Sequence, residues 1–100
     1  MIYLFLTFFL DIREILRQVS PYIIRQWREV CLKLGLQELE LVQLEMNGYH
    51  SSKAHLAFKA LCLWYDHVGK SATKEKLMSA LKQCGLHRAE GKLYDVIMLI

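Results

Sequence analysis

Two short apolar stripes meet at a Leu-Gly-Leu step in the first half of the chain. The first stripe follows the i, i+3, i+4, i+7 spacing of one helix face and contains Trp27, Val30, Cys31 and Leu34. Gly35 comes next, where the end of a helix favours a residue that adopts a left-handed conformation. A second apolar pattern starts at once and contains Leu36, Leu39, Leu41 and Leu44. Short helices this closely joined predict a compact bundle that works through its surface rather than through a pocket.

The remaining segments show the same helical period, separated by serine, proline and glycine. Ser20-Pro21 is expected to close one helix and open the next, because serine caps helices and proline suits the first helical position. Further caps are expected at Ser51-Ser52 and at Ser71 or Thr73. The predicted helices cover approximately 7–19 or 11–19, 22–34, 37–46, 51–68, 71–84 or 73–84, and 87–98. No segment alternates with period two, so the predicted fold class is all-α, a six-helix antiparallel bundle.

The composition fits one domain with a modest core. The chain has 100 residues, of which 54% are apolar. Its three cysteines, Cys31, Cys62 and Cys84, lie on predicted apolar faces, and an odd number without paired spacing indicates reduced thiols in the cytosol. The formal charge of +3 is mild, and the basic residues are scattered among acidic ones. This distribution differs from the basic stripe of a typical nucleic-acid-binding domain.

The first ten residues, MIYLFLTFFL, are almost entirely apolar. A membrane-spanning helix needs about 20 apolar residues, so ten do not suffice alone. The basic start and small-residue cleavage site of a signal peptide are missing. Three interpretations stay open: an extension of the first helix into the core, the end of a longer hydrophobic segment, or a non-native leader. We therefore divide the chain into an apolar leader of unclear role, 1–10, and a helical domain, 11–100.

Several motifs occur in an order that is typical of one family. Trp27-Arg-Glu-Val-Cys precedes Leu34-Gly-Leu36, and Glu40-Leu-Val-Gln-Leu-Glu45 follows. The later motifs are Ala60-Leu-Cys-Leu-Trp64, Ala72-Thr-Lys-Glu-Lys-Leu77 and Ala80-Leu81. With these motifs the chain resembles the death domain, a six-helix module of the death-fold superfamily, over about residues 11 to 97. The last predicted helix lacks an Arg-x-Asp-Leu tripeptide, which argues against the related death-effector domain.

The resemblance implies a non-catalytic protein–protein interaction module without cofactors. Its partners would be other death-fold domains, in homotypic or heterotypic assemblies, and not nucleic acid or a small-molecule substrate. The implied role is that of a cytoplasmic adaptor in signal transduction of the apoptosis or innate-immunity type. A membrane would be involved only indirectly.

Charge along the chain suggests where a partner binds. Glu38, Glu40 and Glu45 are the only charged residues between positions 36 and 52, which gives this segment a net charge of −3. The segment before it carries +2 and the segment after it +4. An acidic helix beside basic ones suits a head-to-tail contact between copies, although an ordinary solvated helix face has the same appearance. The residues predicted to contact a partner are Arg25, Arg28, Glu38, Glu40, Glu45, Tyr49, Lys53 and Lys74.

Other classes of function have less support. The histidines and cysteines lack the close pairs that structural zinc requires. A nucleophilic Cys31 or Cys84 would need a neighbouring histidine and an open cleft, whereas both lie on predicted core stripes. A helix-turn-helix-like nucleic-acid-binding domain stays an alternative, but its recognition helix would carry the three glutamates, which phosphates repel. A membrane-adjacent domain anchored through Met1–Leu10 is the other alternative.

Overall fold

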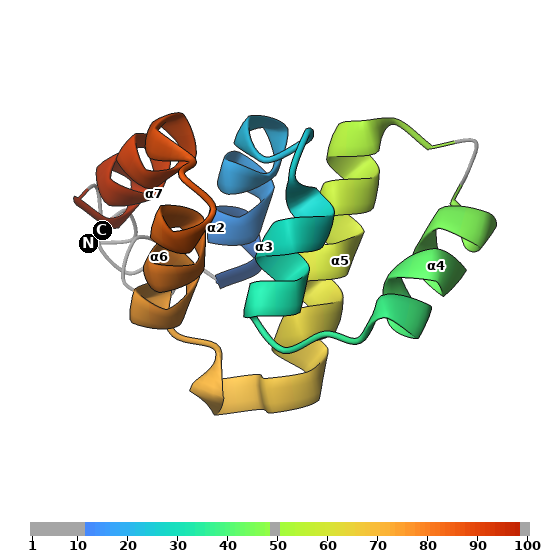
Figure 1. Cartoon of the computed structure of the whole chain (residues 1–100). Coiled ribbons are helices and arrows are strands. Elements are labelled where there is room, and N and C mark those ends of the chain that lie inside the picture. Colours follow the sequence, from blue (N-terminus) through green and yellow to red (C-terminus); the bar gives the residue numbers. More distant parts are fainter. Residues whose placement is uncertain (1–11, 49–50, 99–100) are drawn as a thin grey trace, which may run out of the picture.

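The computed structural model describes residues 12–48 and 51–98, and the elements below carry the labels of Figure 1. Within these residues the chain forms six α-helices, two short 3-10 helices and no strand. The elements in chain order are α2 (Ile12–Val19), η1 (Ser20–Tyr22), α3 (Trp27–Lys33), α4 (Glu38–Asn47), α5 (Lys53–Val68), η2 (Gly69–Ser71), α6 (Lys74–Gln83) and α7 (His87–Met98). The predicted all-α six-helix bundle is confirmed. The predicted leader, Met1–Leu10, lies outside the described residues.

The second predicted helix starts later than expected, at Trp27 instead of residue 22. Ser20 does not cap it: the Ser20 hydroxyl is buried and donates a hydrogen bond back to the carbonyl of Leu16 at 2.6 Å. Pro21 instead sits in η1, and the backbone N–H of Ile23 closes that turn on the Ser20 carbonyl at 3.2 Å. The turn places Ile23 fully in the core, which a continuous helix from residue 22 would not require.

The Leu-Gly-Leu step ends α3 as the sequence predicts. Gly35 has φ +104°, in the left-handed region. Its N–H bonds to the carbonyl of Leu32, and the N–H of Leu36 bonds to the carbonyl of Cys31, both at 3.0 Å. This pair of bonds is the Schellman motif. The same pair recurs at Gly85, which ends α6.

The expected alternatives for two helix caps are resolved. Ser52 caps α5, since its hydroxyl accepts a hydrogen bond from the N–H of His55 at 3.1 Å. Thr73 caps α6, because its hydroxyl accepts from the N–H of Lys76 at 3.2 Å.

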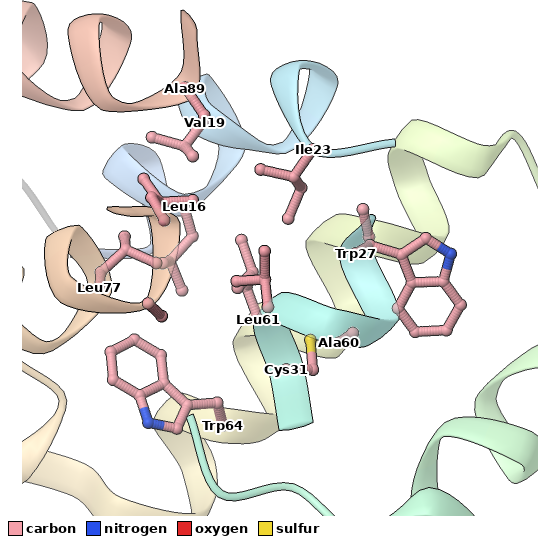
Figure 2. Packing of buried hydrophobic residues seen from close by; sticks show 14 of the residues in the cluster. Leu16, Val19, Ile23, Trp27, Cys31, Ala60, Leu61, Trp64, Leu77 and Ala89 are labelled. Carbon is pink, nitrogen blue, oxygen red and sulfur yellow. The ribbon is translucent and has the colours of Figure 1, made fainter. Parts of the chain in front are cut away.

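The core lies around the long helix α5, which packs against α2, α3 and η1, while α7 packs against α2 and α6. Figure 2 shows Trp27 and Trp64 at its edges, with Leu61 between the surrounding helices. Trp27 is 6% and Trp64 2% exposed, so both tryptophans anchor the core. Of the second apolar pattern, Leu36 and Leu41 are buried, whereas Leu39 is 67% exposed.

Candidate protein interaction surface

Helix α4 has the least buried surface of the helices that carry predicted partner residues. It packs mainly on α5 and stands beside the rest of the bundle (Figure 1). Leu41 is its only buried residue. At its start, Gln37 and Glu40 form a reciprocal capping box, in which the N–H of Gln37 donates to the Glu40 carboxylate at 2.9 Å. Caps of this kind satisfy the free N–H groups of the first turn and stabilise a short helix.

The outward face of α4 is apolar. Leu39, Val42 and Met46 are 67%, 37% and 71% exposed, and their i, i+3, i+7 spacing places them on one face. That face is opposite Leu41, because successive helix residues are rotated by about 100°. We call Leu39, Val42 and Met46 the α4 stripe. Large apolar side chains that gather on one exposed helix face are typical of a binding surface.

One flank of the α4 stripe is fixed by Arg28 of α3. Its guanidinium pairs with both Glu38 and Glu45, which stand seven residues apart on α4. The same group lies 5.7 Å from the centre of the Trp27 ring, a cation–π contact. Three of the residues predicted to contact a partner therefore meet one another within the chain. Their ion pairs leave one net negative charge on this flank.

The other flank carries Glu40, whose carboxylate hydrogen-bonds His67 near the end of α5. The backbone hydrogen bond from Gln37 is the main cause that lowers the pKa of Glu40, and the bond to His67 adds to it. Glu40 is therefore ionised at neutral pH. It also has a structural role, because replacing it with lysine would remove half of the capping box. The double variant Glu38→Lys/Glu40→Lys would therefore perturb the helical structure of α4 as well as its charge.

The other predicted partner residues do not join this surface. Arg25 lies in the turn before α3 and lines a separate hollow with Arg88. Lys53 is the first residue of α5, and Lys74 is the first residue of α6, which follows the opposite end of α5. Both lysines are exposed. Tyr49 lies outside the described residues.

Three features of the surface were not predicted from the sequence: the Glu40–His67 pair, the Arg25–Arg88 pair and the α4 stripe. His67 follows Glu40 by 27 residues and Arg88 follows Arg25 by 63, and no short-range pattern connects such pairs. The α4 stripe had a signal, since Leu39, Val42 and Met46 share a helix face. A helical period alone does not say which of two apolar faces is buried, so this signal does not identify an exposed stripe.

Cys31 and Cys84, the two cysteines considered as nucleophiles, are not activated. Cys31 is fully buried, and burial raises the pKa of its thiol to about 12. Burial also raises the pKa of Cys84, and the neighbouring Glu29 raises it further. Thiols that stay protonated at neutral pH react slowly as nucleophiles. In the part of the chain that the structure describes, no three His, Cys, Asp or Glu side chains are placed to hold a metal ion. No helix there is long and apolar enough to cross a membrane.

The six helices and the apolar outer face of α4, with charged residues on both sides, are typical of helical protein interaction domains. Comparison with protein families is specific: the model of the family described as Death domain matches residues 11–97. The chain belongs to the death domain family. Comparisons with curated proteins and with solved structures gave no significant match. Death domains are non-catalytic interaction modules that bind other death-fold domains, and they are typically soluble cytoplasmic modules.

Proposed function

We propose that this protein is a non-catalytic adaptor domain that assembles with other death-fold domains in cytoplasmic signalling of the apoptosis or innate-immunity type. The observation that carries the proposal is the α4 stripe. Helix α4 has 10 residues, of which one is buried, and it exposes three large apolar side chains. Folding of the chain alone therefore buries little of the apolar surface of this helix. Covering that face with a partner removes it from water.

The charges around the stripe support a partner with basic residues. Glu38, Glu40 and Glu45 flank Leu39, Val42 and Met46, and Arg28 compensates one of the three negative charges. Exposed ion pairs contribute about 0–1 kcal/mol each, so they orient the partner more than they hold it. Within a second copy of the chain, the exposed Lys53 and Lys74 supply complementary charge. These acids also disfavour the nucleic-acid alternative, because phosphates repel them.

Association can be tested with the double variant Leu39→Ser/Met46→Ser. The matched control is Tyr94→Ser/Met98→Ser, which removes two side chains of α7 that are 58% and 65% exposed. Light scattering over a range of protein concentrations reports self-association, and titration with purified death-fold domains reports heterotypic binding. We expect the α4 variant to lose association and the α7 variant to keep it.

Two results would argue against this proposal. The first is equal association of the α4 and α7 double variants. The second is a chain that stays monomeric at every concentration and binds no death-fold domain. Circular dichroism of both variants checks that the helices are intact.

A further inference from the structure

A second surface feature lies where the turn before α3 meets the start of α7. It is a hollow of about 420 Å³. Tyr22, Ile24 and Arg25 line it from the first segment, and Leu86 and Arg88 line it from the second. None of these residues belongs to the α4 stripe or its flanks. The hollow is therefore a site of its own.

The charged side chains that line the hollow are all positive. Arg25 and Arg88 line it, both are exposed, and neither has a hydrogen-bond or ion-pair partner among residues 12–48 and 51–98. No acidic residue is part of its lining. The acids nearest in sequence to the two arginines hydrogen-bond other residues: Glu29 accepts from Gln26 at 3.4 Å, and Glu90 bonds His87 at 3.0 Å. Two unpaired guanidiniums thus face one concave region, which concentrates their field.

The two walls of the hollow are connected. The side-chain amide of Gln26 donates a hydrogen bond to the backbone carbonyl of Cys84 at 3.3 Å. The N–H of Leu86 is fixed on the carbonyl of Leu81 at 3.0 Å. The backbones that carry Arg25 and Arg88 are therefore held in place before any ligand arrives. A site organised in advance loses less entropy on binding.

Phosphate chemistry matches this arrangement better than a carboxylate does. A phosphorylated side chain carries about −1.5 to −2 charges at neutral pH, close to the two positive charges of the arginines. Guanidinium groups bind phosphoryl oxygens through paired hydrogen bonds, and arginine clusters recognise phosphorylated segments in other domains. A single carboxylate would leave one guanidinium without a partner. A phosphoryl group fills only part of the hollow, so the apolar Ile24 and Leu86 remain for neighbouring side chains.

We propose that the Arg25–Arg88 hollow binds a phosphorylated serine or threonine, flanked by apolar residues, on a partner protein. This site goes beyond the proposed death-fold assembly and does not depend on the α4 stripe. It would allow a kinase to control which partner the domain holds.

The test uses a short peptide with one phosphoserine between two leucines, together with its serine and glutamate forms and with inorganic phosphate. NMR titration of the full chain at about physiological salt follows the guanidinium Nε–H signals of Arg25 and Arg88. We expect the phosphopeptide to shift both signals and to bind at least about ten-fold more tightly than the glutamate form. Inorganic phosphate should shift the same signals with lower affinity.

Variants locate the site. Arg25→Gln and Arg88→Gln should each weaken phosphopeptide binding about ten-fold, the loss expected for a charged hydrogen bond, and the double variant should abolish it. Arg25→Lys keeps the charge but not the paired hydrogen bonds, so it should weaken binding as well. Lys70→Gln is the control, because it removes one exposed positive charge on η2, outside the hollow. All these positions are exposed, and thermal unfolding confirms that each variant is folded.

Several results would overturn the proposal. Equal affinity for the glutamate form would identify a carboxylate site, and equal affinity for inorganic phosphate would identify a free-anion site. An equal loss in Lys70→Gln would show nonspecific attraction to positive charge. If the Arg25 and Arg88 signals do not shift at millimolar phosphopeptide, the hollow does not bind phosphorylated side chains. Leu39→Ser/Met46→Ser should keep full phosphopeptide affinity, so failure of the α4 assembly and failure of this site are distinguishable.

Discussion

Glu40 on α4 and His67 on α5 form a hydrogen bond between two helices that pack against each other. On the opposite flank, Glu38 and Glu45 pair with Arg28 of α3. All three carboxylates of α4 thus meet partners from neighbouring helices, while Leu41 alone is buried. Helix α4 is attached along its polar flanks, and its apolar outer face stays available.

The Glu40–His67 bond predicts a shift in a measurable titration. In the folded protein the pKa of Glu40 lies below its usual value, mainly because Gln37 N–H donates to it and in part because of His67. In the variant His67→Ala the pKa of Glu40 should rise part of the way toward the usual glutamate value, because the Gln37 N–H still donates to its carboxylate. Carbon-detected NMR titration of the Glu40 carboxyl in both proteins measures this. An unchanged pKa would show that His67 does not contact the ionised carboxylate in solution.

The same shift fixes the sign of a stability effect. Because the pKa is lower in the folded than in the unfolded state, the unfolded chain binds more protons between the two values. The contribution of ionised Glu40 is therefore fully present above about pH 4.3, the usual glutamate value, and is lost as the pH falls through the folded-state pKa. Urea midpoints of the parent and of Glu40→Gln should differ most near pH 7 and converge toward pH 3. A constant difference would contradict this linkage.

Two leucines separate the core from the outer face. Leu81 is fully buried in α6, whereas Leu39 is 67% exposed on α4. Leu81→Ala should lower the free energy of unfolding by about 2–5 kcal/mol, through lost burial and the cavity that remains. Leu39→Ala should change it by less than about 0.5 kcal/mol, as surface substitutions do. Urea denaturation of both variants checks the contrast, and a comparable loss in the two would contradict the assignment of α4 faces.

Much of the helical pattern could be predicted from the sequence, because caps and periods are local. Gly35 was placed at a left-handed helix end, and its φ of +104° confirms this. The start of α3 could not be predicted, because the Ser20 hydroxyl donates to the carbonyl of Leu16 and does not cap a helix. Both options are local hydrogen bonds, so the sequence alone does not distinguish them; in the structure the back-bonded serine accompanies a fully buried Ile23.

The surface was less predictable than the helices. Opposite charges on Arg28 and Glu38 fit a contact between copies as well as one within a chain, and their sequence positions do not distinguish the two. In the structure the pair lies within the chain. The residues Arg25 and Arg88 meet only because the bundle folds back on itself, so their hollow had no sequence signal.

Two glycines should respond to alanine with opposite signs. Gly91 lies within α7, and an added Cβ there meets nothing within 4 Å. Gly91→Ala should stabilise the protein by about 0.5–1 kcal/mol, because alanine is the better helix former. Gly35→Ala should destabilise it by about 1–2 kcal/mol, since the left-handed conformation crowds a Cβ. Thermal unfolding of both variants measures the difference, and equal signs would contradict the assigned backbone conformations.

Arg28 should control the local opening of α4 more than the stability of the whole domain. Its pairs with Glu38 and Glu45 are partly exposed, so Arg28→Gln should cost only about 0–1 kcal/mol in the free energy of unfolding. Because α4 has little buried surface, the loss of both ion pairs should still raise the hydrogen-exchange rates of its amides. The amides of α5 should keep their protection, since the core around Leu61 and Trp64 is untouched.

The control for Arg28 is Lys33→Gln, which removes an exposed positive charge from the same helix without touching α4. It should leave the exchange of α4 amides unchanged. High salt should raise α4 exchange in the parent and reduce its difference from Arg28→Gln, because salt screens exposed ion pairs. If α4 and α5 amides lose protection together, α4 is part of one cooperative unit with the core. If α4 alone loses it, a partner that covers the α4 stripe also stabilises the helix, and binding should restore slow exchange there.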